Sequence, residues 1–428
     1  MRGILIGCGF LALSVLGQTP KELLARSGIT GGLVVHLGCQ DGNAAVALRA
    51  NEGILVHALV ASEPILAKVR AQVRAAGVYG PISVHRLRGG RLPYADGLVN
   101  LLLAEELGAV SMGEVRRVLA PRGVALVKRG GKWQRIDQPW PEEIDEWTHF
   151  MHGADNNAVA NDTVIGPPER VQWVAGPMWT RDHDVTPSIF APVSAKGRLF
   201  YALEYGPVCV IDKRLPERYA LVARDAFNGV LLWQRPMDPW YSTTVIWGHI
   251  PVHSNRRLVA VDDRVYATLG LKAPVTALHA ATGKTFREYA GTECTSEIVC
   301  DGKTLGLVIR KEQANGGLQV GRDRKRFRRG FTGPTPGSEA VMAVDAESGK
   351  TLWRHERSCT PLTLALHGGK AFFVEEKSVV CLELATGREL WKVPFPARTL
   401  VITDQLVLAA TDRGDTNYSR SSKTIRLV

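Results

Sequence analysis

Two short polar segments contain the residue types that bind metal ions or polar substrates. The segment "WTHFMHGADNN" contains His149, His152 and Asp155, and the segment "WTRDHDVTPS" contains His183 and Asp184. Imidazole and carboxylate groups hold a metal ion when at least three of them converge on one point. His149 and His152 would share one face of a helix but point to opposite sides of a strand. Both segments are therefore candidates for a metal or substrate site, and the alternative is hydrogen bonding at turns and strand ends.

A third candidate is a glycine-containing loop near the start of the chain. The stretch "VVHLGCQDGNAAVA" runs from a β-branched strand through Gly38 and Gly42 into an alanine-rich helix start. Glycine allows the backbone to approach a nucleotide closely because no Cβ atom intervenes. Gly38, Asp41 and Gly42 are therefore the candidate cofactor-binding residues. Gln40 fills the middle position of the loop with a side chain.

The elements around this loop alternate between strands and helices. The apolar strand segments are "LVVHL", "ILVHALV", "LVNLLLAEEL" and "GVALVK", and helical spacing is present in "NAAVALRA" and "EPILAKVRAQVRAAG". Apolar strands separated by helices are typical of a parallel sheet that is covered on both faces. The sequence therefore predicts a Rossmann-like α/β domain over residues 20–135.

This arrangement resembles the class I methyltransferases that use S-adenosylmethionine (SAM). Gly38 to Gly42 stand where that family has a G-x-G-x-G loop, "RLPYADGLVNLLLAEEL" looks like its L-P-F/Y-x-D-x-x-F-D segment, and "EVRRVLAPRGVALV" looks like its R-V-L-x-P-G-G segment. The resemblance implies a SAM site at the loop. Five residues depart from the family pattern, in places where it has glycine or an acidic residue: His36, Gln40, Val60, Asn100 and Arg122. We therefore expect a degenerate domain, with methyl transfer as an alternative.

Four related segments in the second half of the chain predict repeated hairpins. They are "RDAFNGVLLWQRP", "LHAATGKTFREY", "VDAESGKTLWRHE" and "LELATGRELWKVP". A polar residue and a glycine can form the turn in each copy. Tryptophan follows the glycine by four positions in three copies, where its indole can pack against a neighbouring copy. The residues that define the repeat are Asp225, Gly229, Trp233, Gly283, Asp345, Gly349, Trp353, Gly387 and Trp391.

These hairpins resemble the quinoprotein repeat, which is named after the cofactor pyrroloquinoline quinone (PQQ). Three of the segments upstream of the hairpins, "RLVAVDDRVYATLG", "TSEIVCDGKTLGLVI" and "LALHGGKAFFVEE", each read as a strand, a turn and a strand. Four strands per unit are typical of a β-propeller blade. The D-x-x-T/S-G-x-x-L-W signature occurs in quinoprotein alcohol dehydrogenases and in cofactor-free periplasmic propellers of the outer-membrane assembly lipoprotein type. The resemblance implies a propeller over residues 136–428, with about five to six blades at roughly 40 to 50 residues each. Because "SSKTIRLV" at the end of the sequence reads like a strand that leads into another hairpin, we expect an incomplete propeller.

The resemblance to quinoprotein dehydrogenases also implies PQQ with Ca²⁺, a catalytic aspartate and a disulfide between adjacent cysteines. The sequence has no Cys-Cys pair, and we assign no catalytic residue or calcium ligand by position. Cys294 with Cys300, or Cys359 with Cys381, could form disulfides, and buried thiols are the alternative. PQQ with Ca²⁺ is therefore retained as an alternative, whereas SAM is not expected.

The first residues predict export from the cytoplasm. Arg2, an apolar run over residues 4–16 and a small residue at Gly17 are typical of a signal peptide over residues 1–17. The run is shorter than the roughly 20 residues of a transmembrane helix. The segment "RDRKRFRR", residues 322–329, contributes +5 of the net charge of +11, and it is either a solvated loop or a patch for an acidic partner. Export argues against nucleic acid as that partner.

These features favour a bacterial-type periplasmic or secreted protein with no transmembrane segment. Its predicted role is binding or scaffolding of a protein or polysaccharide partner through the propeller or the basic loop. A PQQ-dependent oxidoreductase that acts on an alcohol or sugar is the first alternative, and a SAM-dependent methyltransferase is the second.

Overall fold

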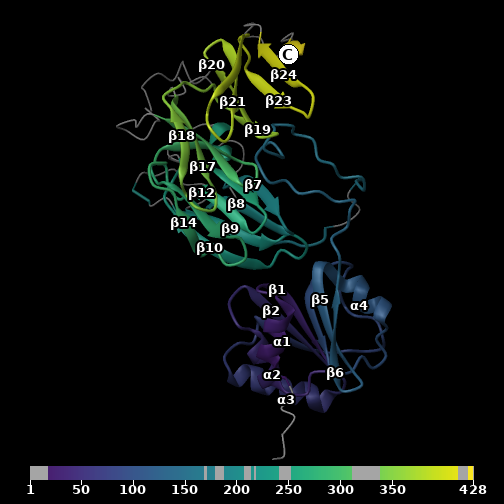
Figure 1. The fold of residues 1–428 in the computed structure, drawn as a ribbon. Coiled ribbons are helices and arrows are strands. Elements are labelled where there is room, and N and C mark those ends of the chain that lie inside the picture. Colours follow the sequence, from purple (N-terminus) through teal and green to yellow (C-terminus); the bar gives the residue numbers. More distant parts are fainter. Residues whose placement is uncertain are drawn as a thin grey trace, which may run out of the picture.

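The computed structural model describes most of the chain. It covers residues 18–167, 171–178, 188–206, 214–215, 218–240, 252–310, 338–412 and 423–427. The predicted signal peptide, His183, Asp184 and the basic segment 322–329 lie outside these residues. Figure 1 shows the described part as an α/β domain below and a series of antiparallel sheets above. No helix in the described part is long and apolar enough to cross a membrane.

The α/β domain contains one six-stranded sheet with the strand order β3-β2-β1-β4-β5-β6. Strands β1 to β5 are parallel, and β6 is antiparallel to β5. The strands are β1 (Gly32–Leu37), β2 (Ile54–Val60), β3 (Ile82–Arg86), β4 (Val99–Ala104), β5 (Leu119–Arg129) and β6 (Lys132–Asp137). Helices α1 (Pro20–Ser27), α2 (Gly42–Leu48) and α3 (Glu63–Ala75) pack on one face, and α4 (Met112–Val118) packs on the other.

The antiparallel sheets follow one another as propeller blades. Blades 1 to 4 have four strands each, and blade 5 has three among the described residues. The 3-10 helix η1 (Val252–Arg257) precedes blade 2. The strands are β7 (Ile189–Ala195), β8 (Arg198–Glu204), β9 (Tyr219–Asp225) and β10 (Leu231–Met237) in blade 1; β11 (Leu258–Val261), β12 (Arg264–Thr268), β13 (Val275–His279) and β14 (Thr285–Glu288) in blade 2; β15 (Thr295–Cys300), β16 (Thr304–Arg310), β17 (Ser338–Asp345) and β18 (Thr351–His355) in blade 3; β19 (Ala365–His367), β20 (Lys370–Glu375), β21 (Ser378–Glu383) and β22 (Glu389–Pro394) in blade 4; and β23 (Thr399–Ile402), β24 (Val407–Asp412) and β25 (Lys423–Leu427) in blade 5.

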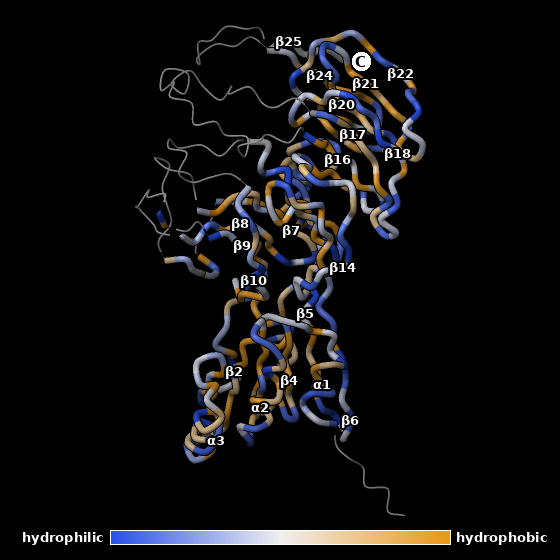
Figure 2. The backbone as a smooth tube through the Cα atoms, turned by 90° about the vertical axis from the view of Figure 1, so that its left-hand side faces the viewer, coloured by the Kyte–Doolittle hydropathy of each residue, from blue (hydrophilic) through white to orange (hydrophobic). Residues whose placement is uncertain are grey.

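The core of this part lies between successive blades. Buried apolar side chains form separate clusters that join blade 1 to blade 2, blade 2 to blade 3, blade 3 to blade 4 and blade 4 to blade 5. Figure 2 shows apolar residues along the strands of both parts of the molecule. The sequence prediction of an α/β domain followed by propeller blades is therefore confirmed.

Repeat tryptophans and glycines couple blade 1 to blade 2 and blade 3 to blade 4. The indole of Trp233 lies against Gly283 of blade 2 and donates to the Ala280 carbonyl at 2.8 Å. Trp353 likewise lies against Gly387 and donates to a blade 4 carbonyl at 2.7 Å. These glycines have φ values of +67° and +73°, and a Cβ atom at either would lie 2.6 Å from the indole. Glycine is therefore required both by the turn and by the close indole.

The two parts of the molecule are joined by a hydrogen-bonded contact around Asn100. Its amide nitrogen donates to Asp225 Oδ2 at 2.7 Å, and its amide oxygen accepts from Asn228 Nδ2 at 2.7 Å. The same oxygen accepts the Leu33 N–H at 2.7 Å. Because Asp225 and Asn228 form the β9–β10 turn, this turn of blade 1 is docked on the start of β4.

Candidate functional site

The first backbone N–H groups of α2 are hydrogen-bonded within the protein. The Gly42 N–H donates to Gln72 Oε1 at 2.8 Å, and the Asn43 N–H donates to Asp41 Oδ1 at 3.1 Å. The Ala44 N–H donates to the Asp41 carbonyl at 3.2 Å. The first amides of a helix are the groups that would bind an anionic ligand. In this loop they are occupied by side chains and backbone of the protein itself.

Gly42 serves the packing of two helices. A Cβ atom at this position would lie 2.7 Å from the Cβ of Gln72 and 2.9 Å from the Val69 carbonyl oxygen, both on α3. Gly38 is different, because its φ of +76° requires glycine while its nearest contact would be the Glu106 carbonyl oxygen at 3.6 Å. The two glycines are therefore explained by helix packing and by a turn.

The surrounding positions do not supply the groups that a SAM site needs. Val60 is buried at the end of β2, where a carboxylate would hold ribose hydroxyls. The next acidic residue, Glu63, pairs with Arg86 at 3.3 Å. Burial lowers the pKa of His36, and its Nδ1 atom has no hydrogen-bond partner among the described residues. The residues present do not fit SAM.

Two of the five departures from the methyltransferase pattern do not lie at the loop. Asn100 stands near the start of β4, at the opposite edge of the sheet from Gly38. Arg122 interrupts β5 near its start with a φ of +65°, the conformation that glycine adopts readily. Asn100 therefore does not bear on cofactor binding at the loop, because it lies at the other edge of the sheet and contacts blade 1.

A hydrogen-bonded chain that the sequence analysis missed lies on the sheet face opposite α2 and α3. His57 Nδ1 lies 2.7 Å from the Tyr94 hydroxyl, and His57 Nε2 lies 2.8 Å from His85 Nδ1. Burial and, second, the nearby His85 lower the pKa of His57 to about 4. The sequence feature that could have indicated this contact is the single histidine in each of the segments "ILVHALV" and "ISVHR". These three side chains can relay a proton between tautomers, and within the described part of the protein no carboxylate is hydrogen-bonded to them.

The first polar segment forms the centre of the propeller. We call residues 147–155 the central segment. Each of the first strands of the five blades donates one backbone N–H to it. The pairs are Ser194 to the Trp147 carbonyl (2.7 Å), Ala260 to the Thr148 carbonyl (3.0 Å), Cys300 to His149 Nε2 (3.0 Å), Leu366 to the Ala154 carbonyl (2.8 Å) and Ile402 to the Asp155 carbonyl (2.9 Å).

The candidate metal ligands in this segment face different partners. His149 is buried, its Nδ1 lies 2.7 Å from the Thr148 hydroxyl, and burial lowers its pKa to about 3. His152 Nε2 lies 2.7 Å from Asp145 Oδ2. Asp155 accepts the Asn157 N–H at 3.0 Å. Within the described residues, no group of three or more His, Cys, Asp or Glu side chains could hold a metal ion.

A cluster of buried charges lies next to the central segment. Glu297 is fully buried, and its carboxylate lies 3.6 Å from Arg256 and 3.7 Å from Arg310. Arg256 also donates to the Asn156 amide oxygen and to the Leu364 carbonyl, the latter at 2.8 Å. Burial lowers the pKa of Arg256 and Arg310. Through charge-assisted bonds the cluster therefore links η1 and blade 3 to Asn156, which follows the central segment, and to Leu364, which precedes β19.

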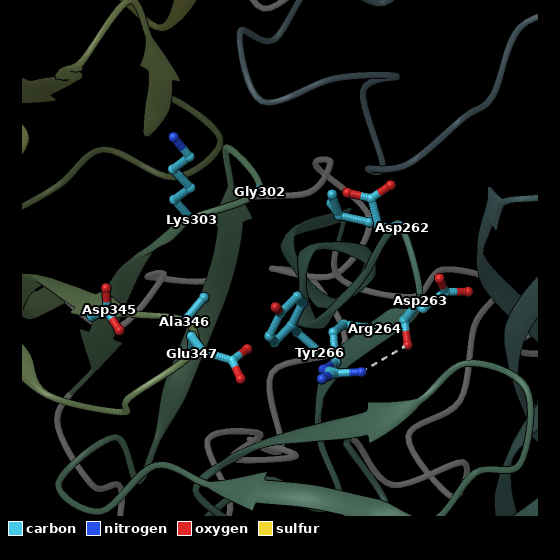
Figure 3. A pocket seen from close by; sticks show the side chains of 10 residues that line it. Asp262, Asp263, Arg264, Tyr266, Gly302, Lys303, Asp345, Ala346 and Glu347 are labelled. Atoms are coloured by element: carbon cyan, nitrogen blue, oxygen red, sulfur yellow. Dashed lines mark hydrogen bonds between the residues drawn. The ribbon is translucent and has the colours of Figure 1, made fainter.

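A polar pocket opens between blades 2 and 3 (Figure 3). It has a volume of about 450 Å³ and lies among the β11–β12, β15–β16 and β17–β18 turns. Its lining includes Asp262, Asp263, Arg264, Tyr266, Lys303 and Glu347. Asp263 is held by Lys196 at 2.7 Å and by Arg198 at 3.3 Å. The pocket offers both donors and acceptors to a polar group, without a nucleophile and base in contact.

The described cysteines are present as thiols. Neither Cys294 with Cys300 nor Cys359 with Cys381 is joined in a disulfide. Burial raises the pKa of Cys300 to about 12 and that of Cys381 to about 11. These thiols are therefore poor nucleophiles.

Comparison with protein families finds one match in the propeller. Residues 337–424 match the family model described as outer membrane protein assembly factor BamB. No curated protein matches the chain.

Solved structures that resemble the chain match its first quarter. A putative SAM-dependent methyltransferase from Methanococcus maripaludis is 18% identical, with a TM-score of 0.24, over 25% of this chain and 52% of that one. A putative sarcosine dimethylglycine methyltransferase from Galdieria sulphuraria is 23% identical, with a TM-score of 0.23, over 25% and 45%. The putative methyltransferase complex with the Trm112 activator from Haloferax volcanii gives 27% identity and a TM-score of 0.22 over 26% and 50%. The chain thus spans about half the length of these structures or less.

Proposed function

We propose that this protein is an exported binding or scaffold protein in which the methyltransferase-like domain is a docked, non-catalytic platform and the propeller binds the partner. The observation on which this rests is the occupied start of α2. The Gly42 amide, which a SAM ligand would approach, is bonded to Gln72 of the same domain.

The contact between the two parts supports a platform role. Asn100, Asp225 and Asn228 form a polar contact. Leu232 of blade 1 lies so close to Gly31 and Gly53 that a Cβ atom at either glycine would clash with it. All of these α/β residues lie at or before the amino ends of β1, β2 and β4. The propeller therefore contacts the edge of the sheet opposite the glycine loop, and none of its described residues contributes to that loop.

The proposed partner is a protein or polysaccharide that meets the propeller, with the mixed-charge pocket of blades 2 and 3 as one polar contact point. The basic segment 322–329 is a second proposed contact. The periplasmic or secreted location rests on the first 17 residues of the sequence.

Calorimetry of the whole chain with SAM tests the proposal. We expect no saturable heat at about 1 mM SAM, a concentration at the upper end of ordinary enzyme affinities. The matched variants are Gln40→Gly, which restores the family glycine, and Gln72→Ala, which frees the Gly42 amide. Micromolar binding by the unmodified chain would show that the loop is a working site and would remove the proposal.

The quinoprotein alternative has a separate test. Among the described residues no group of three or more His, Cys, Asp or Glu side chains could hold a metal ion, so none of them is assigned as a calcium ligand. Titration with PQQ and Ca²⁺, followed by absorbance and by dye-linked alcohol oxidation, should give neither a bound quinone nor turnover. A stoichiometric quinone spectrum with alcohol oxidation would replace the scaffold proposal by the oxidoreductase.

A further inference from the structure

The pocket between blades 2 and 3 lies where the repeat lacks its tryptophan. Phe200 and Trp233 of blade 1 are in register with the same residue of β9, and their ring centroids lie 5.9 Å apart. The corresponding residues of blade 2, both in register with one residue of β13, are Tyr266 and Arg287. The indole that packs on the inner ring of blade 1 is therefore absent at Tyr266, and Tyr266 lines the pocket.

Two side chains of blade 2 make the hydrogen bonds across this junction instead. The Tyr289 hydroxyl donates to the Ala346 carbonyl at 2.6 Å, and Arg287 Nε donates to the Glu347 carbonyl at 3.1 Å. The Ala346 carbonyl has the place of the carbonyl that accepts the indole N–H at the junction of blades 1 and 2. The junction thus keeps its hydrogen bonds without an indole ring beside Tyr266.

The turns above this place are not joined by an ion pair. At the junction of blades 1 and 2, Lys196 reaches across to Asp263 at 2.7 Å. Asp262 of blade 2 has the turn position of Lys196, and Lys303 of blade 3 has that of Asp263. Asp262 pairs back with Lys196 at 3.3 Å, and among the described residues no ion pair joins it to Lys303. The space between blades 2 and 3 is therefore left open.

The charges around the pocket are balanced. The charged side chains of its lining are Asp262, Asp263, Arg264, Lys303, Asp345 and Glu347. Lys196 and Arg198 of blade 1 pair with the two carboxylates of the β11–β12 turn, so four carboxylates meet four cations. A ligand with a net charge gains no overall attraction from such a set. An uncharged ligand with several donors and acceptors can form charge-assisted hydrogen bonds with it.

One acceptor and one donor of the lining are available to a ligand. Asp345 accepts a backbone N–H of its own turn at 2.7 Å, and Arg264 lies over a phenylalanine ring of its own blade at 3.8 Å. Within the described part of the chain, no hydrogen bond or ion pair engages the Glu347 carboxylate or the Lys303 ammonium group. In Figure 3 the Glu347 side chain points towards Tyr266, whereas Lys303 points away from both.

We propose that this pocket binds an uncharged sugar unit of a polysaccharide partner. Each hydroxyl group of a sugar is both a donor and an acceptor, so the ring can donate to Glu347 and accept from Lys303. Val261 and Tyr266 supply apolar atoms for its C–H groups, and the volume of about 450 Å³ is in the range of small-molecule sites. A cationic side chain of a protein partner would also face Arg264 and Lys303, which repel it.

This inference rests on the proposed function, because it names the ligand class of the propeller that binds the partner. The two can fail separately. A chain that binds neither SAM nor sugar would keep the non-catalytic platform and lose the sugar site. A chain that binds both would lose the platform and keep the sugar site.

Amide resonances of the whole chain give the first test. The probes are glucose, galactose, mannose and N-acetylglucosamine, each added to about 50 mM, because a single sugar ring has few atoms and millimolar affinity is expected. At least one of them should shift the Gly302 and Ala346 resonances, which belong to the pocket, in a saturable way. The absence of a saturable shift with all four sugars would overturn the inference.

A pair of carboxylate variants gives the second test. Glu347→Ala removes the acceptor but leaves the backbone carbonyl that binds Arg287, so it should weaken sugar binding by at least about tenfold. The matched control is Glu356→Ala, since Glu356 is an exposed carboxylate of the same blade that pairs with Arg354 outside the pocket. It should leave the affinity unchanged. Equal affinities of the two variants would contradict the assignment.

Methylguanidinium at the same concentration separates the sugar from an arginine side chain of a protein partner. We expect no saturable shift of the Gly302 and Ala346 resonances with this cation. Saturable binding of methylguanidinium that Glu347→Ala removes, without binding of any of the sugars, would assign the pocket to a cationic protein partner and overturn the inference.

Discussion

Replacing Asn100 with alanine should weaken the contact between the α/β domain and the propeller more than an ordinary surface substitution. The change removes one donor to the Asp225 carboxylate and the acceptor for the Leu33 N–H and the Asn228 amide. Asp225 is buried and keeps two backbone donors on its other oxygen, at 2.9 and 3.0 Å. The variant therefore leaves one buried carboxylate oxygen and one half-buried N–H without their partners.

The size of the effect follows from the types of bond. A hydrogen bond to a charged group contributes about 1.5–3 kcal/mol and a neutral one about 1 kcal/mol. The loss of one charged and two neutral bonds predicts a decrease in unfolding free energy of about 3–5 kcal/mol. Asn51→Ala is the matched control, because Asn51 also makes two bonds at this edge of the sheet but is exposed and reaches only its own domain. It should cost about 1 kcal/mol.

The pH dependence of the Asn100→Ala effect gives an internal check. Burial raises the pKa of Asp225, and the Asn100 bond opposes this rise. A carboxyl group whose pKa is raised in the folded state favours folding most when it is protonated, and this contribution is lost as the pH rises through that pKa. The gap between wild type and Asn100→Ala should therefore be largest at neutral pH and should narrow as the pH falls towards the raised pKa.

Urea denaturation at several pH values measures the unfolding free energy and its pH dependence. Hydrogen exchange at the Leu33 amide reports on its bond to Asn100. We expect a lower midpoint and faster exchange at Leu33 in Asn100→Ala, with only small changes in Asn51→Ala. An Asn100→Ala midpoint equal to that of Asn51→Ala, with the same gap at every pH, would refute the assignment of Asn100 to the domain contact.

Five further substitutions, two of them controls, test the propeller. Trp353→Ala should lower the unfolding free energy by about 3–5 kcal/mol, measured by urea titration, and Trp391→Ala should cost less because its indole is only half-buried. Gly283→Ala should lower the unfolding free energy by at least about 1 kcal/mol more than Gly291→Ala. Both glycines have positive φ, but of the two only Gly283 faces a close indole. Equal losses of unfolding free energy would argue against the packing contact. His149→Gln should flatten the pH dependence of the urea midpoint between pH 6.5 and about 3, because the neutral ring stabilises the fold above the usual pKa and this contribution is lost as the pH falls towards its lowered pKa.

The sequence predicted the elements whose pattern is local. Apolar strands with intervening helices gave the α/β sheet, and the polar residue, glycine and tryptophan of each repeat gave the hairpins of blades 1 to 4. These patterns depend on neighbours within a few residues. By contrast, β3 was missed because "ISVHR" is short and half polar.

The contacts that define the candidate sites depend on residues far apart in the sequence. The contact of Trp173 with Gly229 of blade 1 was not predicted, because no hairpin glycine precedes this tryptophan. The only sequence feature that could have indicated it is the likeness of "VQWVAGP" to the repeat segments "LLWQRP" and "ELWKVP". His57 and His85 meet because β2 and β3 pair in one particular register. The sequence marked the central segment as a candidate metal or substrate site from its histidines and its aspartate. Its hydrogen bonds to the blades could not be predicted, because the partners are five strands spread over residues 194–402.

The most direct test of the central claim is the behaviour of the Gly42 amide in solution. Its N–H is bonded to Gln72 at 2.8 Å, so the amide resonance of the whole chain should be protected from exchange and should not move when SAM is added to about 1 mM. A Gly42 resonance that is unprotected without ligand and shifts in a saturable way with SAM would show an open, working site, and it would contradict the account of this domain as a platform.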